Sequence, residues 1–495
     1  MKNKLSSTAV KVAAVPGQGM GRYKDLRTFI GELEKAGELH RIKAEVDWDG
    51  EIGAITRAVY HRKGPAMMFE NVKGSTIPLF CGAMHKARNF GMQINCDGDM
   101  RSQIDYLTKA MANVIPPVVV REGPCQENVV LGDNVDLSIF PSPKWHPKDG
   151  GRYLGTMGCI VSQDPDTHIN NVAVFRAMVE GKNKIGFNCE QQNGIHLRKY
   201  RDLKQDMPFA MSIGAPPAVT IAAIAKVPYG VDEYSVAGGI CECPIPMVKC
   251  ITNDLLVPAD SEIVLEGYVP WNTDEWQLEG PYGEFTGHFS ADQPIKRPTA
   301  VVTAVTHRNN PILQGTSPGV GPNENSLAMT MCFTPAWRAA LLASGVPGVK
   351  DVHAVEMGCG AFVCVVSLSR HFQAGNAMQV MNVIQSFGQH PKITICVDDD
   401  IDVFDMGMVL WAVASRVQPH RDCLITTPNN LGCPLDPSIP DEHKGFPKAR
   451  SSRLLIDATK YHKPGTTFSA MVLDPPEAKK RVADRWKDYG FTFNY

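Results

Sequence analysis

The feature of this 495-residue sequence that most limits its fold is a change of character at Pro116. From there to about Thr316 the chain is made of short β-rich runs separated by glycine and proline. The runs lie at residues 118–121, 158–162, 172–179 and 299–306. Many short strands that end at such turns are typical of a barrel or another closed sheet. We therefore predict a barrel-like central region.

Different patterns precede this region. Asp25 stands before an apolar stripe at helical spacing over residues 26–33, and Gly37 follows the stripe. This arrangement predicts a capped amphipathic helix. A short apolar strand bounded by turn residues is expected within residues 64–74. The N-terminal part is therefore predicted to be mixed α/β.

Helical spacing returns at residues 325–343, where Pro335 must kink or restart the helix. Beyond it, strands and helices alternate, which predicts a second α/β domain. Strands are expected at 362–368 and 393–397, and helices at 377–387 and 408–416. A last, charged helix at 476–489 is expected to dock on a neighbouring subunit or domain.

Length and charge exclude several classes of protein. A chain of 495 residues is too long for one ordinary core, so two or three domains are expected. Lys plus Arg (50) nearly balances Asp plus Glu (52), and no stretch gathers excess basic charge, so nucleic acid is not an expected partner. The longest apolar runs, such as residues 218–225, fall far short of the roughly 20 residues that cross a bilayer. Residues 1–20 lack the long apolar stretch of a signal peptide and are read as a loose tail.

Cysteine usage indicates the compartment. Most of the 14 cysteines lie inside apolar runs, where a free thiol behaves as a small core side chain. This favours a reducing environment and hence a cytoplasmic protein. Cys241 and Cys243 form an isolated C-x-C with no second pair nearby, for which a structural use is expected.

The densest chemical cluster is the sequence LEGPYGEFTG, in which Glu279 and Glu284 flank a Gly/Pro turn. On a straight strand the two acids would face opposite sides, but the turn can bring both carboxylates to one pocket. Neighbouring carboxylates repel, so one of them could keep its proton near neutral pH and act as a general acid. The alternative is a surface turn with two solvated acids.

Arg176 is the candidate partner of this acid pair. It is a lone cation inside an apolar strand, where burial is costly unless a carboxylate or an anionic ligand meets it. Arginine can hold a carboxylate with two parallel hydrogen bonds, and so position both a protein acid and a substrate acid.

Asn171, His196 and Glu233 form a second candidate set. Their oxygen, imidazole and carboxylate groups suit a divalent cation such as manganese or magnesium, especially when a phosphate completes the coordination shell. The three residues are scattered along the chain, and each could equally be an ordinary core or loop residue.

Several blocks together resemble the UbiD family. They are NNVAVFRAMV, the histidine of NGIHLRKY, VDEYSVAGGI with the following VKCITNDLLVPADSEIVLEG, LEGPYGEFTG and VDDDIDVFDMGMVLWAVASR, in the family's order and at similar spacing, with GPCQENV as a further similar block. They cover most of the chain from about residue 60 to 440. The combination is far more specific than any single motif.

The resemblance implies an α+β multidomain fold. Its expected parts are a flexible tail (1–22), an N-terminal α/β region (23–115), a split β-barrel flavin-binding domain (116–322), a connecting helix (323–345) and a C-terminal α/β oligomerisation domain (346–495). It also implies a homodimer or homohexamer that uses prenylated FMN (prFMN), supplied by a separate flavin prenyltransferase, with Mn²⁺ or Mg²⁺ and K⁺.

The same resemblance implies an activity and residue roles. The chain would decarboxylate an aromatic, heteroaromatic or α,β-unsaturated acid reversibly and without oxidation, through a covalent cofactor adduct of cycloadduct or quinoid-like type. Asn171, His196 and Glu233 would hold the metal on the cofactor phosphate. Arg176 would contact the cofactor and form a catalytic network with Glu279 and Glu284, and Glu284 would be the proton donor.

Two points stay open at this stage. The segment between Arg176 and His196 is about two residues longer than in fungal ferulic acid decarboxylases of the family, and Ile195 replaces a glutamine, which leaves the phosphate contacts open. Alternatives to an aromatic acid decarboxylase are a decarboxylase of acrylic, cinnamate-like acids, a carboxylase at high bicarbonate, a split-barrel flavin reductase and a non-catalytic cofactor-binding protein. The intact acid pair and arginine argue against the last two.

Overall fold

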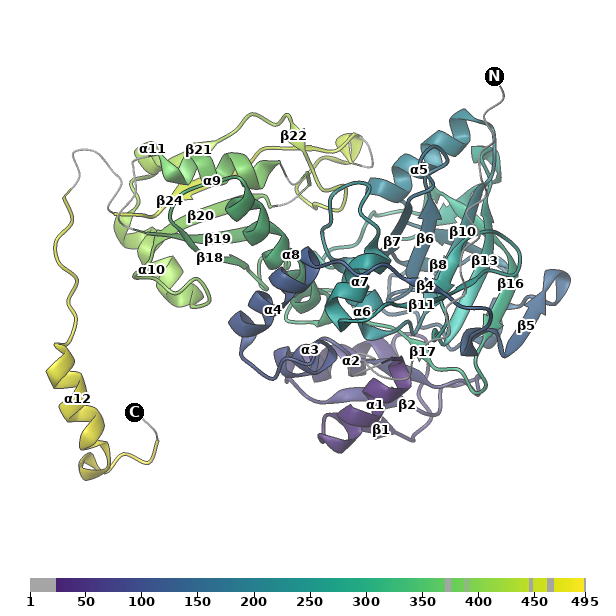
Figure 1. Ribbon diagram of the computed structural model, residues 1–495, viewed down its shortest axis with the longest axis horizontal. Helices are drawn as coiled ribbons and strands as arrows, with labels where there is room; N and C mark the ends of the chain where they lie inside the picture. The colour runs from purple at the N-terminus through teal and green to yellow at the C-terminus, as the bar shows by residue number, and fades with distance from the viewer. Residues whose placement is uncertain are drawn as a thin grey trace, which may run out of the picture.

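The computed structural model describes residues 24–369, 375–386, 388–389, 391–444, 448–460 and 467–493 (Figure 1). The tail expected at 1–22 lies outside the described residues.

The N-terminal region is a small mixed sheet covered by helices. Its elements are α1 (Leu26–Lys35), β1 (Leu39–Ile42), α2 (Glu51–His61), β2 (Ala66–Phe69), β3 (Leu79–Cys81), α3 (Ala87–Gln93) and α4 (Met100–Ala112). The predicted cap is confirmed, because the Asp25 carboxylate accepts a hydrogen bond from the backbone N–H of Thr28. The predicted strand is β2, whose four side chains are all buried. The sheet order is β1-β2-β3-β17, where β17 (Leu313–Gln314) returns from the end of the central region.

The central region is built on an eight-stranded antiparallel sheet. Its strands are β5 (Asn128–Leu131), β6 (Cys159–Gln163), β7 (Asn170–Val174), β8 (Ala177–Val179), β9 (Lys184–Phe187), β10 (Met207–Ile213), β13 (Ile263–Val269) and β16 (Thr299–His307). Seven of them follow the order β7-β6-β10-β13-β16-β9-β8, and β5 pairs with β16. Their inward side chains form one apolar core with the facing surface of the N-terminal region.

The two ends of this sheet are joined directly by the chain. β7 and β8 are the first and last strands of the order, yet only two residues, Phe175 and Arg176, separate them. A link this short spans at most about 10 Å, so the two edges lie close together and the sheet is rolled into an incomplete barrel. The prediction of a single strand at 172–179 was therefore wrong, because the segment forms two strands. The chain leaves β7 at one edge of the sheet and enters β8 at the opposite edge, and we call the place where these two edges meet the seam.

The other elements of the central region are smaller, and several of them pack against the curled sheet. They are α5 (Gln191–Asp202), α6 (Pro217–Ile224), α7 (Glu233–Cys241), β4 (Val118–Val119), β11 (Pro246–Lys249), β12 (Leu256–Pro258), β14 (Gln277–Glu279) and β15 (Ile295–Arg297). The run predicted at 118–121 as part of the barrel is the short β4. It pairs with β11 in a separate three-stranded sheet, so that prediction was wrong about its place.

A long buried helix, α8 (Glu324–Ala343), lies between the curled sheet and the C-terminal region (Figure 1). Its first turn is capped by Asn323, whose side chain accepts from the backbone N–H of Ser326. Of the two outcomes predicted at Pro335, a kink or a restart, the restart is wrong, because one continuous helix runs through the proline. Most of its side chains are buried, so tertiary packing holds the helix where a proline removes one backbone hydrogen bond.

The C-terminal region has a five-stranded sheet in the order β18-β19-β20-β24-β21. Its elements are β18 (Val349–Ala354), β19 (Val363–Leu368), α9 (Asn376–Gln385), β20 (Ile393–Asp398), α10 (Met406–Arg416), α11 (Pro419–Asp422), β21 (Cys423–Ile425), β22 (Asn430–Leu431), β23 (Arg450–Ser451), β24 (Leu454–Asp457) and α12 (Pro476–Asp484). The alternation of strands and helices predicted for this region is confirmed. α12 lies apart from the rest of the chain in Figure 1.

All 14 cysteines are free thiols, and those predicted to be core side chains are buried. Within the described residues, no helix is both long and apolar enough to span a membrane.

Candidate active site

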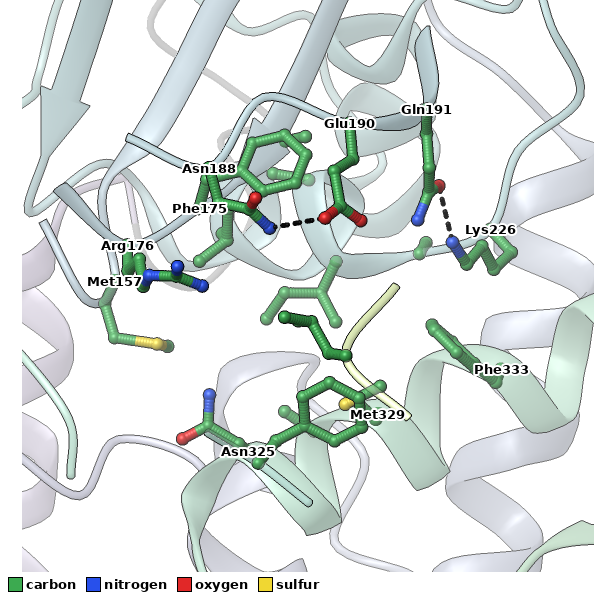
Figure 2. Close-up of a pocket in the computed structure, with 18 of the residues that line it drawn as sticks. Met157, Phe175, Arg176, Asn188, Glu190, Gln191, Lys226, Asn325, Met329 and Phe333 are labelled. Atoms are coloured by element: carbon green, nitrogen blue, oxygen red, sulfur yellow. Dashed lines mark hydrogen bonds between the residues drawn. The ribbon is translucent and has the colours of Figure 1, made fainter. Parts of the chain in front are cut away.

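A cavity of about 220 Å³ lies where the seam of the curled sheet meets α8 (Figure 2). Its walls come from β7 and the seam, from the segments that precede α5 and follow α6, from the start of α7 and from the turn after β14. Side chains of α8 and a few residues of the C-terminal region complete the wall. The cavity is therefore assembled from distant parts of the chain.

Arg176 stands at the seam and binds both acids of the Gly/Pro turn. Its Nε and one terminal nitrogen donate to the two oxygens of Glu279 at 2.8 and 2.9 Å, and its other terminal nitrogen donates to Glu284. All three side chains are at most 7% exposed. Buried charges persist when they are paired in this way, so the alternative of a solvated surface turn is excluded.

The turn between the two acids explains how both reach one arginine. β14 ends at Glu279, and Gly280 then takes a backbone φ of +84°, which is open to glycine and strained for other residues. A Cβ on Gly283 would lie only 2.5 Å from His146 Nδ1, so this position also needs glycine. The chain thus reverses tightly enough to place Glu284 beside the carboxylate of Glu279.

The two carboxyl groups differ in acidity. Burial disfavours the charged form of Glu279, but Arg176 on both of its oxygens and the Tyr153 hydroxyl, 3.0 Å from Oε1, outweigh burial and lower its pKa. For Glu284 the effect of burial is the largest, and the pKa of this carboxyl group is raised to about 7. The charge of Arg176 lowers the pKa, and the charge of Glu279 raises it further. One acid is therefore held ionised, while the other can carry a proton near neutral pH.

The second predicted set lies nearby but is less compact. Asn171 on β7 and Glu233 at the start of α7 line the cavity, whereas His196 on α5 does not. His196 is linked to Asn171 through hydrogen bonds, since Ser162 Oγ contacts His196 Nδ1 at 2.9 Å and Asn193 Oδ1 at 2.9 Å, and Asn171 donates to that same Asn193 oxygen. The described residues contain no group of three or more His, Cys, Asp and Glu side chains placed for a metal ion.

The chemistry of this set nevertheless suits a cation. Glu233 is 4% exposed, and its Oε2 accepts a hydrogen bond from the backbone N–H of Val172 at 2.9 Å. Because burial is not offset by a positive group, the pKa of Glu233 is raised to about 8. Burial also lowers the pKa of His196 to about 4, so its imidazole is neutral at pH 7. A cation beside Glu233 and Asn171 would balance the carboxylate, and the donor types match a divalent ion.

Several cavity residues were missed by the sequence reasoning. Asn188, Glu190 and Lys226 line the cavity wall, with Lys226 at the end opposite Arg176, and Asn325 faces them from α8 (Figure 2). Each is a single polar residue that no recognised motif contains: Asn188 and Glu190 lie in a polar segment, Lys226 follows an apolar run, and Asn325 begins the predicted helical segment. The only signal was the added length between Arg176 and His196, which contains Glu190.

Comparisons with known proteins agree with this geometry. Sequence models of the three domains of 3-octaprenyl-4-hydroxybenzoate carboxy-lyase match the chain: the N-terminal domain at residues 30–104, the Rift-related domain at 118–321 and the C-terminal domain at 328–458. Pyrrole-2-carboxylic acid decarboxylase of Pseudomonas aeruginosa is 34% identical over 504 aligned positions, which cover 94% of this chain and 98% of that protein.

Solved structures with this fold include two enzymes. Vanillic acid decarboxylase of Sedimentibacter hydroxybenzoicus in its closed form matches with a TM-score of 0.84 and 30% identity, over 94% of this chain and 99% of that one. An evolved dimeric form of the UbiD-class enzyme HmfF of Pelotomaculum thermopropionicum, in complex with prFMN, matches with a TM-score of 0.75 and 28% identity, over 92% and 98%.

The fold and these matches define a carboxy-lyase with mixed α/β content and a curled half-barrel sheet. The chain belongs to the UbiD family.

Proposed function

We propose that this protein catalyses the reversible, non-oxidative decarboxylation of an aromatic or heteroaromatic carboxylic acid, with Glu284 as the proton donor. The observation that carries the proposal is the buried cluster at the seam, where one arginine contacts an ionised Glu279 and a Glu284 whose pKa is raised to about 7. The names of the related enzymes, which act on pyrrole-2-carboxylic and vanillic acid, support an aromatic substrate.

Arg176, Glu279 and Glu284 have different roles in the proposed reaction. Glu279 holds Arg176 from one side with two hydrogen bonds and leaves the third contact of the guanidinium to Glu284. When Glu284 is protonated, Arg176 loses one anionic partner and can attract the carboxylate of the substrate. After carbon dioxide leaves, the acid of Glu284 delivers its proton to the substrate carbon that carried the carboxyl group.

The cavity suits a flavin cofactor. Its walls combine apolar side chains, such as Met157, Phe175 and Met329 (Figure 2), with the buried carboxyl group of Glu233, which has no positively charged partner among the described residues. We propose that prenylated FMN binds here, with Asn171, His196 and Glu233 holding Mn²⁺ or Mg²⁺ at its phosphate, Arg176 near its ring and K⁺ close by. When bound, it supplies the electron sink that decarboxylation at an sp² carbon needs.

The proposal also covers the domain organisation and the oligomeric state of the protein. We propose the regions 23–115, 116–322, 323–345 and 346–495. The family match at 118–321 lies close to the second region and the match at 30–104 lies within the first, whereas the match at 328–458 begins inside the proposed connecting helix. The last region is proposed to join subunits in a homodimer or homohexamer, and a flavin prenyltransferase is proposed to supply the cofactor.

A substrate panel tests the function. The protein is co-expressed with a flavin prenyltransferase, its cofactor is identified by mass spectrometry, and carbon dioxide release is measured with aromatic, heteroaromatic and acrylic acids. We expect a modified flavin and turnover of ring acids. Turnover of cinnamate-like acids alone would contradict the substrate class, and an active enzyme without a flavin would contradict the chemistry.

A further inference from the structure

The cavity holds a carboxylate to which the proposed reaction assigns no role. Glu190, in the segment before α5, is 4% exposed, and its side chain extends into the middle of the cavity (Figure 2). Its Oε1 accepts from the side-chain Nδ2 of Asn188 at 2.9 Å. Its Oε2 has no hydrogen bond, and the side chain forms no ion pair, within the described part of the chain. A buried carboxylate in this state lacks a donor.

Asn188 adds a second acceptor to the same wall. Because its Nδ2 is committed to Glu190, its Oδ1 remains, and this atom is buried without a hydrogen-bond partner among the described residues. Turning the amide over would place Oδ1 against the carboxylate of Glu190, acceptor against acceptor, so the contact with Glu190 fixes the orientation. With Glu190 ionised, the two side chains therefore offer acceptors and no free donor.

The cations of the cavity are engaged elsewhere. Arg176 donates to the two acids of the seam cluster, and the ammonium of Lys226 donates to Gln191 Oε1 at 2.6 Å (Figure 2). Neither is within ion-pair distance of Glu190. Arg297, the cation that acts most strongly on Glu190, does not line the cavity and forms no ion pair with Glu190 among the described residues. A bound molecule that carries a hydrogen-bond donor would therefore satisfy Glu190.

We propose that Glu190, oriented by Asn188, selects acids whose ring carries a hydrogen-bond donor, an N–H or a phenolic O–H, over matched acids without one. The inference rests on the proposed function and narrows its substrate class. A site built of buried acceptors discriminates strongly against an analogue that lacks the donor, because the acceptors are then desolvated without a partner. Apolar walls alone would discriminate weakly between such acids.

Matched substrate pairs test this selection. With the holoenzyme, kcat/KM is measured for pyrrole-2-carboxylate against furan-2-carboxylate and for 4-hydroxybenzoate against 4-methoxybenzoate. We expect the better-processed pair to favour its donor-bearing member about tenfold or more, as for other buried polar sites. In Glu190→Gln, which keeps the shape of the side chain but adds a donor, the preference should fall to within about threefold. A wild-type enzyme that treats both members of each pair alike would overturn the proposal.

A second carboxylate of this region provides the control. Glu180 accepts from Thr299 Oγ1 at 3.0 Å, has a pKa raised to about 7 by burial, and does not line the cavity. Glu180→Gln should therefore keep the wild-type preference. If Glu190→Gln lowered kcat/KM equally for both members of a pair, Glu190 would be a structural residue and the proposal would fail. The proposal would also fail if the variant lost flavin while its remaining holoenzyme kept the wild-type preference, because Glu190 would then be a cofactor residue.

Equilibrium binding separates this inference from the proposed function. Calorimetry with the FMN-loaded protein compares the same acids without any turnover. We expect the donor-bearing acid to bind more tightly to the wild type, and the difference to disappear in Glu190→Gln. If no acid were decarboxylated but this difference were present, the proposed reaction would fail while the recognition by Glu190 stood. If acids were decarboxylated without the difference, only the inference would fail.

Discussion

Two polar clusters meet at the seam of the curled sheet, and they differ in how their charges are balanced. In the acid cluster, Arg176 contacts both Glu279 and Glu284, so protein atoms alone complete it. In the second cluster, Glu233 is buried against a backbone N–H and His196 is neutral at pH 7. The first cluster can therefore hold a proton near neutral pH on Glu284, whereas in the second Glu233, whose pKa is raised to about 8, would exchange its proton for a bound cation. Substitutions in the first cluster should therefore reduce turnover, and substitutions in the second should reduce the binding of metal and cofactor.

The largest expected effect is on turnover, in the acid cluster. Glu284→Gln keeps the size and hydrogen bonding of the side chain but cannot deliver a proton to carbon, so activity should fall by roughly 10²–10⁴-fold. Bound flavin should remain, because the second cluster is untouched. Carbon dioxide release and the cofactor content of the purified protein measure the two quantities.

A finer readout follows the proton itself. Exchange of solvent deuterium into the product at the former carboxyl carbon needs the same acid and should be lost together with turnover. If the Glu284→Gln protein exchanged and decarboxylated at close to the wild-type rate, Glu279 would become the candidate donor. Glu180→Gln, outside the cavity, is the matched control and should behave as the wild type.

The next effect is on metal and cofactor, in the second cluster. His196→Ala removes the imidazole, and we expect metal binding to weaken on the order of 10–100-fold, with loss of flavin, because the cation that neutralises the phosphate is held less well. Metal analysis of the purified protein and flavin absorbance measure this. Ser162→Ala removes only the hydroxyl that contacts His196 Nδ1 at 2.9 Å and should give a smaller loss. Full retention of metal and flavin in His196→Ala would remove the distinction between the clusters.

The pH dependence of the wild type gives a smaller, graded effect. The folded-state pKa of Glu284 is raised to about 7, so its carboxyl group is protonated below pH 7 and ionised above it. Since the proton-donating form is lost as the pH rises, kcat should fall above pH 7, by about tenfold per pH unit when protonation limits the rate. A kcat profile that stays flat from pH 6 to 9 would contradict this role for Glu284.

The smallest expected effect comes from the support of Glu279. Tyr153→Phe removes the hydroxyl that donates to Glu279 at 3.0 Å while Arg176 keeps its two contacts. We expect a loss of about 1–2 kcal/mol in the free energy of unfolding and a few-fold fall in kcat, because the hydrogen bond is to a charged group. Denaturant unfolding and steady-state kinetics check both. A loss of turnover as large as that of Glu284→Gln would show that Tyr153 takes part in the proton transfer.

Much of the fold could be predicted from local signals. Gly and Pro turns marked β6, β16 and the run that contains β7 and β8, Asp25 marked the first helix, and the alternation after residue 346 indicated the C-terminal sheet. These signals act over a few residues, so they are present in the sequence itself. The break between β7 and β8 was missed because both sides of Arg176 have the composition of a strand, and only the closing of the sheet decides that the chain changes edge there.

The candidate site divides in the same way. The sequence by itself indicated that the Gly/Pro turn can bring Glu279 and Glu284 together, and that Arg176, if buried, needs an anionic partner. Only the tertiary structure decided which acid keeps its proton, since that depends on how far burial and Arg176 each act on the two carboxyl groups. It also decided the place of Glu190, which faces the cavity only because β7, α8 and the C-terminal region enclose it. Burial and the distances between remote segments set these properties, and neither quantity is encoded in the spacing of residues along the chain.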